Sequence, residues 1–240
     1  MIKVFRNIRH QLIDKGNLKS YLLYAIGEIF LVMVGILLAL QVNNWNENRK
    51  NSIREKQLLN ELVTNLNSNL EAFKQNIAAQ NEQIRGIDTI LDYLEYKKPY
   101  QDSLAFYLRP LIYLEQITAS KSTYETLKST GLDLIQSDEL RREITQLFEM
   151  TYPISINLIR DVAMQRYNQT QSMMLKYVRV NKKRTMAVPI DYNALLKDQI
   201  FINWLYDRRG WKVAVINSNQ NLIEQTKALL DSIHAYLQDK

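Results

Sequence analysis

The chain has 240 residues, 23% of them charged, with a formal net charge of +6 and a mean hydropathy of −0.29. It contains no cysteine, which excludes disulfides, thiolate metal sites and cysteine nucleophiles. Glycine and proline are scarce, at six and four residues, and this favours long helices over a turn-rich β fold. One long apolar stretch in an ordinary charged chain also argues against a transporter with many spans.

Residues 1–20 form a basic segment with a net charge of +4, from five Lys or Arg and one Asp. Apolar residues recur between them at helical spacing, which predicts a short amphipathic helix on the membrane; a frayed tail is the alternative. Positive charge before a span favours the cytoplasmic side. We therefore expect a cytoplasmic N-terminus, a periplasmic C-terminal domain and contact with lipid rather than nucleic acid. Basic residues after the span weaken this signal: Arg49, Lys50, Arg54 and Lys56.

Residues 21–42, YLLYAIGEIFLVMVGILLALQV, carry one charged side chain and no proline. At about 1.5 Å per residue, such a helix is roughly 33 Å long and crosses a hydrocarbon layer of about 30 Å. Tyr21, Tyr24 and Trp45 lie near its two ends, where aromatic rings anchor a span at the membrane interface. The run exceeds the apolar region of a signal peptide and lacks a small-x-small cleavage site, so we predict an uncleaved transmembrane helix.

One face of this span is expected to meet another helix. Glu28, Val32, Gly35 and Ala39 follow each other at helical spacing, and a pair of small residues four apart lets two backbones approach closely. An acid in the membrane also avoids lipid by facing a partner. We predict a transmembrane oligomer interface at these four residues. Glu28 acts there either as interhelical contact or as part of an ion or proton path; a side chain that reaches the interface is a further alternative.

Residues 43–98 are predicted to continue the same helix, because the polar exit at 41–48 holds no proline or glycine. Ten apolar residues then follow close to heptad spacing, with Gln80 in the one gap. This seam could pack on later helices of the same chain or on another copy as a coiled coil. The asparagines at 60, 65, 67 and 69 favour a bundle. The seam consists of Leu59, Leu62, Leu66, Leu70, Phe73, Ile77, Ile84, Ile87, Leu91 and Leu94.

Residues 99–240 are expected to supply the remaining helices of the bundle. Pro110 demands a break near residue 108, and Pro153 and Gly210 are expected to separate further helices. The predicted helices cover about 103–115, 120–131, 139–150, 154–180, 193–206 and 211–237, with a basic loop at 181–185. The sequence therefore predicts an all-α protein in which one N-terminal transmembrane helix runs into a long helix and an extramembrane helical bundle.

Motifs that carry chemistry do not occur in this sequence. The two histidines, His10 and His234, lie on opposite sides of the predicted span, which does not suit a metal site. There is no G-x-S-x-G, Walker or dinucleotide-binding glycine pattern. Two short helices around Gly131 resemble a helix-turn-helix, yet the second lacks the basic face that reads DNA. We predict no catalytic residue, no cofactor and no metal, and hence a protein that is not an enzyme.

A family resemblance rests on two segments. Residues 24–50, YAIGEIFLVMVGILLALQVNNWNENRK, resemble the N-terminal signature of a family of uncharacterised bacterial single-span membrane proteins, a domain of unknown function. Residues 124–131, YETLKSTG, followed by Leu140 and Arg141, look like that family's second recurrent segment. Phe30 and Met33 stand where β-branched residues are expected. The resemblance implies an envelope membrane protein with a helical body and assigns no activity.

Together these features predict a non-enzymatic, single-pass protein of the bacterial inner membrane. We expect it to self-associate through its span and to present a periplasmic helical bundle as a scaffold or accessory subunit. Its partners would be the lipid bilayer, further copies of itself as a homo-oligomer, or another membrane protein. Two alternatives stay open: a periplasmic ligand sensor that signals through a partner chain, and a small channel or proton-coupled assembly that uses Glu28.

Overall fold

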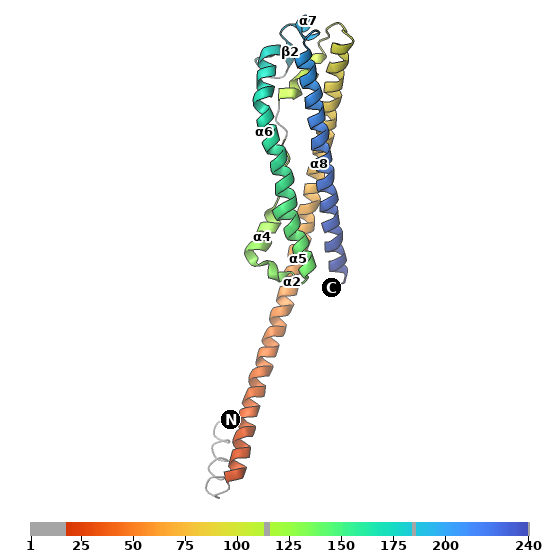
Figure 1. The fold of residues 1–240 in the computed structure, drawn as a ribbon. Coiled ribbons are helices and arrows are strands. Elements are labelled where there is room, and N and C mark those ends of the chain that lie inside the picture. The colour runs from red at the N-terminus through yellow and green to blue at the C-terminus, as the bar shows by residue number, and fades with distance from the viewer. Residues whose placement is uncertain (1–17, 113–115, 184–185, 240) are drawn as a thin grey trace. The chain divides into compact units, whose positions relative to one another are not determined.

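The computed structural model describes residues 18–112, 116–183 and 186–239 (Figure 1). These residues are almost entirely helical, which confirms the predicted all-α class with an apolar N-terminal helix that runs into further helices. The chain divides into two compact units, Met1–Glu55 and Lys56–Lys240. Helix α2 (Leu18–Glu95), 78 residues long, contributes to both units. It ends before Lys97, a non-glycine residue with positive φ, close to the end predicted at residue 98.

The second unit is a bundle in which residues 56–95 of α2 lie beside two other long helices, α6 and α8 (Figure 1). Short helices and one hairpin connect these three. In chain order the elements are α3 (Leu104–Leu108), η1 (Arg109–Ile112), α4 (Ser122–Thr130), η2 (Leu132–Leu134), α5 (Asp138–Thr145), η3 (Gln146–Thr151), α6 (Tyr152–Tyr177), β1 (Val178–Val180), β2 (Ala187–Pro189), α7 (Tyr192–Leu195) and α8 (Gln199–Gln238).

The heptad-like seam of α2 packs inside the chain's own bundle. Eight of its ten apolar residues are buried, and Gln80, in the gap, is buried as well. The N-terminal part of the seam joins one core with α4, α5, α6 and the C-terminal half of α8. The C-terminal part joins a second core with α3, the hairpin and the start of α8. The choice left open by the sequence is thereby settled in favour of packing on later helices of the same chain.

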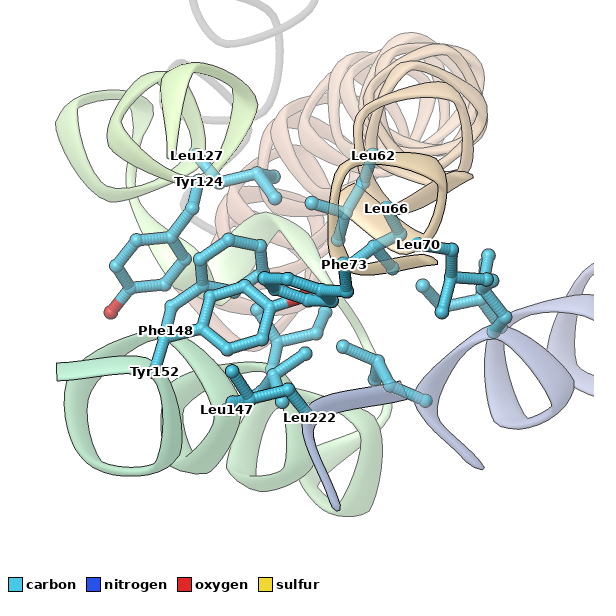
Figure 2. Close-up of a cluster of buried hydrophobic side chains, with 14 of the residues drawn as sticks. Leu62, Leu66, Leu70, Phe73, Tyr124, Leu127, Leu147, Phe148, Tyr152 and Leu222 are labelled. Atoms are coloured by element: carbon cyan, nitrogen blue, oxygen red, sulfur yellow. The ribbon is translucent and has the colours of Figure 1, made fainter. Parts of the chain in front are cut away.

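Aromatic rings fill the centre of the first core (Figure 2). Tyr124 from α4 stacks on Phe148 from η3 with ring centroids 4.8 Å apart. Tyr152 meets the edge of Phe148 at 5.3 Å and that of Phe73 at 5.7 Å. Such pairs add about 0.5–1.5 kcal/mol each beyond burial, so this cluster ties α2, α4 and the start of α6 together.

Helix ends follow local chemistry at several places. Pro110 lies in η1, and the α-helix before it ends at Leu108, as predicted. Gly131 terminates α4 with a φ of 108°, a conformation that L side chains rarely adopt. The Ser137 hydroxyl accepts from the Leu140 N–H and so caps α5.

The break predicted near Pro153 is wrong, because α5, η3 and α6 form one uninterrupted helical segment. Proline donates no backbone hydrogen bond, and its ring clashes with the carbonyl four residues earlier in an α-helix. The Tyr152 N–H bonds to the carbonyl of Leu147, five residues back. This wider π-helical turn directly before Pro153 accommodates the proline without ending the helix.

Two other expectations about the C-terminal part are wrong. Helix α8 continues through Gly210, although glycine costs about 1 kcal/mol relative to alanine in a helix. Buried side chains on both sides of it, among them Leu205 and Val215, offset that cost. Of the basic loop predicted at 181–185, residues 184 and 185 lie outside the described residues. Helix α6 ends at Tyr177, where the predicted helix continued to about residue 180; instead, β1 and β2 pair antiparallel as a short hairpin, Val178 with Pro189 and Val180 with Ala187. Its β-branched residues suit a strand.

Candidate functional site

Most apolar side chains of α2 in the first unit are exposed. Of the described helices, this one is long and apolar enough to cross a membrane, and none of its apolar window is buried. Leu23 is 72% exposed and Ile29 68%. Soluble monomers rarely expose contiguous apolar surface of this extent. By length and composition, the segment could therefore span a membrane.

The four predicted interface residues share one face of α2. Because an α-helix turns by about 100° per residue, Val32, Gly35 and Ala39 lie within about 40° of Glu28 around the axis. Glu28 is half-buried, whereas Val32 and Ala39 are exposed. Apart from the adjacent backbone of α2 itself, a methyl group at Gly35 would meet no atom of the described residues within 4 Å. The backbone of this face is thus open to close approach, and the oligomer interface stays a prediction.

The predicted membrane anchors differ in exposure. Trp45 is 65% exposed, as an indole that meets lipid headgroups has to be, and Tyr24 is half-buried. Tyr21 lies within α2, but its side chain is outside the described residues. The amphipathic helix predicted at residues 1–20 also lies outside them, apart from the first turn of α2.

In the second unit, a pocket of about 480 Å³ opens between segment 116–121, which has no regular secondary structure, and the first turns of α6. Apolar side chains from both elements line it, together with two cationic side chains. Its volume falls in the range of about 300–1,000 Å³ that small-molecule sites occupy. The apolar lining consists of Ile117, Ala119, Pro153 and Ile156, and the cations are Lys121 and Arg160.

Asparagine side chains on α2 hold the segment that forms the outer wall of this pocket. The Asn69 amide is buried; it donates to the Ser120 carbonyl at 3.0 Å and accepts from the Ser120 N–H at 2.8 Å. Asn65 donates to the Ser120 hydroxyl at 2.9 Å, and Asn76 donates to the Gln116 carbonyl at 3.0 Å. These contacts supply hydrogen bonds that a segment outside any helix or sheet otherwise lacks.

Sequence reasoning missed this role of the asparagines. In the sequence, Asn65 and Asn69 indicate a bundle rather than a simple coiled coil, but they do not show that their side chains bind another segment. Their spacing with Asn76, by four and then seven residues, places the three amides on one side of α2 next to the buried seam. Polar residues that recur beside an apolar seam indicate that this side of the helix binds another segment. Their partners lie 40 to 55 residues away, and the spacing of the asparagines does not predict which segment that is.

Glu149 on η3 connects two helices near the pocket. It accepts from Lys128 Nζ at 2.7 Å and from the Tyr124 hydroxyl at 2.9 Å. The hydrogen bond from Lys128 is the main cause that lowers the pKa of Glu149, and the nearby positive charge of Lys121 lowers this pKa further. Burial raises the pKa of the Tyr124 hydroxyl, and the contact with Glu149 raises it further. The negative charge of Glu149 is therefore balanced by the ammonium of Lys128 and by the hydrogen bond from Tyr124.

Two buried cations on α8 lie between the two cores. Lys212 is fully buried, and burial lowers its pKa to about 7. Arg208, one turn earlier, is 3% exposed; burial lowers its pKa to about 10, and its guanidinium donates to the Leu111 carbonyl at 3.4 Å. Burying a charged side chain away from water costs free energy. Lys212 and Arg208 therefore lower the stability of the bundle relative to apolar side chains of similar size.

Metal-ligand clusters are not formed by residues 18–112, 116–183 and 186–239, in which no three His, Asp or Glu side chains are placed to hold an ion. His234 is exposed on α8, and His10 lies outside the described residues. The expectation that the protein has no catalytic residue, cofactor or metal stays a prediction.

The fold and these surfaces define a helical-bundle protein with one long apolar N-terminal helix. A family of unknown function, DUF6090, matches residues 28–207, and the chain belongs to this family. This match confirms the resemblance to an uncharacterised family and covers most of the apolar part of α2 and most of the bundle. Comparison with curated proteins and with solved structures gave no match.

Proposed function

We propose that this protein is a non-enzymatic, single-span protein of the bacterial inner membrane. It self-associates through α2 and presents its helical bundle in the periplasm as a scaffold or accessory subunit. The basic residues at 1–20 support a cytoplasmic N-terminus. The family has no assigned function. It supports a membrane protein only because segment 24–50 resembles the N-terminal signature of single-span membrane proteins.

One observation carries this proposal: α2 has an apolar stretch that is not buried in the described structure, and one face of this stretch holds an acid and two small residues. Between helices in lipid, close packing of small residues and interhelical hydrogen bonds drive association, because burial from water no longer does. Gly35 and Ala39 provide the close approach, and Glu28 provides a polar group that favours a protein neighbour over lipid. A helix that stayed alone in the bilayer would gain nothing from this arrangement.

The experiment is a size measurement of the full chain in detergent by mass photometry. The parent should form a discrete oligomer, and Gly35→Leu should weaken its association by about tenfold or more, since a bulky side chain separates the two backbones. Gly27→Leu is the matched control. Gly27 has the same open surroundings but lies about 100° away from Glu28 around the helix. A monomeric parent, or equal effects of the two substitutions, would contradict self-association through this face.

A ligand sensor is the second candidate, and the pocket at residues 116–121 and α6 is the observation that favours it. A sensor with this architecture would transmit its signal through a partner chain. Ligand binding that changes the oligomer size, or cross-linking between copies, would favour the sensor over a passive scaffold. Binding that leaves both unchanged would favour the scaffold.

A further inference from the structure

We propose that the pocket between residues 116–121 and α6 binds a small amphipathic anion, namely a carboxylate with an apolar body, and that Lys121 and Arg160 hold its carboxylate. This goes beyond the proposed function, and it stands or falls independently of self-association. The juxtaposition that carries it is a pocket of about 480 Å³ whose lining combines apolar side chains with two cations and, among the described residues, holds no acidic side chain.

The apolar part of the pocket fits the body of such a ligand. Ile117 is buried, Ala119 and Ile156 are partly buried against the first core, and the ring of Pro153 completes the surface. An apolar surface of this kind favours an aromatic or aliphatic group at about 25 cal/mol for each Å² removed from water. A fully hydrated ion, such as phosphate, would leave this surface exposed. The lining therefore selects against a bare anion.

The two cations give the pocket its preference for negative charge. Lys121 is half-buried and Arg160 is exposed. The Arg160 Nε contacts the carboxylate of Asp161 at 3.4 Å, and within the described residues this is the hydrogen bond that its guanidinium makes. Its two terminal nitrogens can still donate, in the fork geometry that suits a carboxylate. Each cation has an acidic neighbour, Asp161 beside Arg160 and Glu149 within electrostatic range of Lys121, and the Glu149 carboxylate is already bound by Lys128.

Both walls of the pocket are fixed before a ligand arrives. Asn65, Asn69 and Asn76 hold segment 116–120 on α2. The other wall is held by the buried Tyr152 at the start of α6, whose hydroxyl lies 2.8 Å from that of Thr226 on α8. A site whose walls do not have to be ordered on binding loses less entropy, and this favours affinity for a small ligand.

The test is a binding titration with the full chain in amphipol and a protein-free amphipol blank. Two probes carry the proposed chemistry, 4-phenylbutanoate as a soluble aromatic acid and dodecanoate as a fatty acid. 4-Phenylbutanamide, the uncharged isostere, and inorganic phosphate are the controls. We expect saturable binding of at least one of the two acids, about tenfold weaker binding of the amide because charge-assisted hydrogen bonds are lost, and no binding of phosphate. If 4-phenylbutanoate binds more tightly, the natural ligand belongs to the soluble aromatic acids; if dodecanoate does, it belongs to the fatty acids.

Three variants complete the design. K121Q/R160Q should lose the preference for the acid over the amide, and Asn157→Trp, an exposed position in the lining, should block both compounds. K74Q/K227Q removes the same charge from exposed positions outside the pocket and should bind like the parent. All variants should melt at the parent's temperature, which separates loss of the site from loss of the fold. Absence of saturable binding, equal affinity for acid and amide, or unchanged binding by K121Q/R160Q would overturn the proposal.

Discussion

The buried amide of Asn69 makes a quantitative prediction about how segment 116–121 is held. Asn69→Ala removes two hydrogen bonds to the backbone of Ser120. Each is worth about 0.5–1.5 kcal/mol, and a group left without its partner costs about 1–3 kcal/mol unless water replaces it. Because Ser120 is exposed, water restores part of this loss. We therefore expect the free energy of unfolding to fall by about 2–3 kcal/mol.

Asn67→Ala is the matched control for this substitution. Asn67 is exposed, and its amide donates only to the Val63 carbonyl, one turn back in the same helix, at 2.9 Å. Alanine is a better helix former than asparagine by roughly half a kcal/mol, so this variant should match the parent or exceed it slightly.

The assay is thermal unfolding of the full chain in detergent, followed by far-UV circular dichroism. A loss of about 2–3 kcal/mol corresponds to a fall in melting temperature of roughly 4–12 °C for a domain of this size. Asn69→Ala should also weaken binding of the amphipathic acid, since one pocket wall loses its main attachment. Equal melting temperatures for the Asn69 and Asn67 variants would refute the conclusion that Asn69 fixes this segment.

Three further predictions concern other buried or capping groups. Lys212 binds fewer protons folded than unfolded between pH 7 and 10.5, because burial lowers its pKa. In urea titrations the parent should therefore gain up to about 5 kcal/mol relative to Lys212→Met as pH rises through that window; a pH-independent difference would contradict this. Asp198 caps α8, and chiefly a hydrogen bond from the Tyr177 hydroxyl lowers its pKa. Asp198→Ala should lose about 1–2 kcal/mol in urea unfolding. Asp198→Asn should lose less and should lack the parent's destabilisation as pH falls through the lowered pKa. Tyr152→Phe should lose about 1 kcal/mol with the hydroxyl contact to Thr226, and an unchanged denaturation midpoint would contradict this.

Periodicity in the sequence predicts which face of α2 is buried, and the structure confirms it. Apolar residues at heptad-like spacing lie on one stripe of any regular helix, so Leu59 and Leu94 belong to the same seam whatever covers it. The identity of the covering element depends on contacts between distant segments. It is for this reason that the sequence left open whether α6 and α8 or a second copy pack on the seam.

The positions of buried polar side chains in the bundle were harder to predict from the sequence. Lys212 appears in the sequence as an ordinary basic residue of an amphipathic helix, yet it is fully buried. A helix of 40 residues that packs against other helices along its length has more than one buried side, and hydrophobic spacing alone does not show where a cation falls inside. The pocket likewise arises from two segments more than 30 residues apart.

Pro153 shows why local rules failed at the candidate pocket in particular. A proline in a helix is a reliable breaker only when the turn before it stays α-helical. Here Tyr124, Phe148 and Tyr152 pack around the π-helical turn, and this burial stabilises the wider hydrogen-bonding pattern. The proline that sequence reasoning assigned to a helix boundary thereby becomes part of the pocket lining, one turn before Asn157 and two before Arg160. Departures from local preference concentrate at functional sites in natural proteins, so the position of this departure is itself an argument for testing the pocket first.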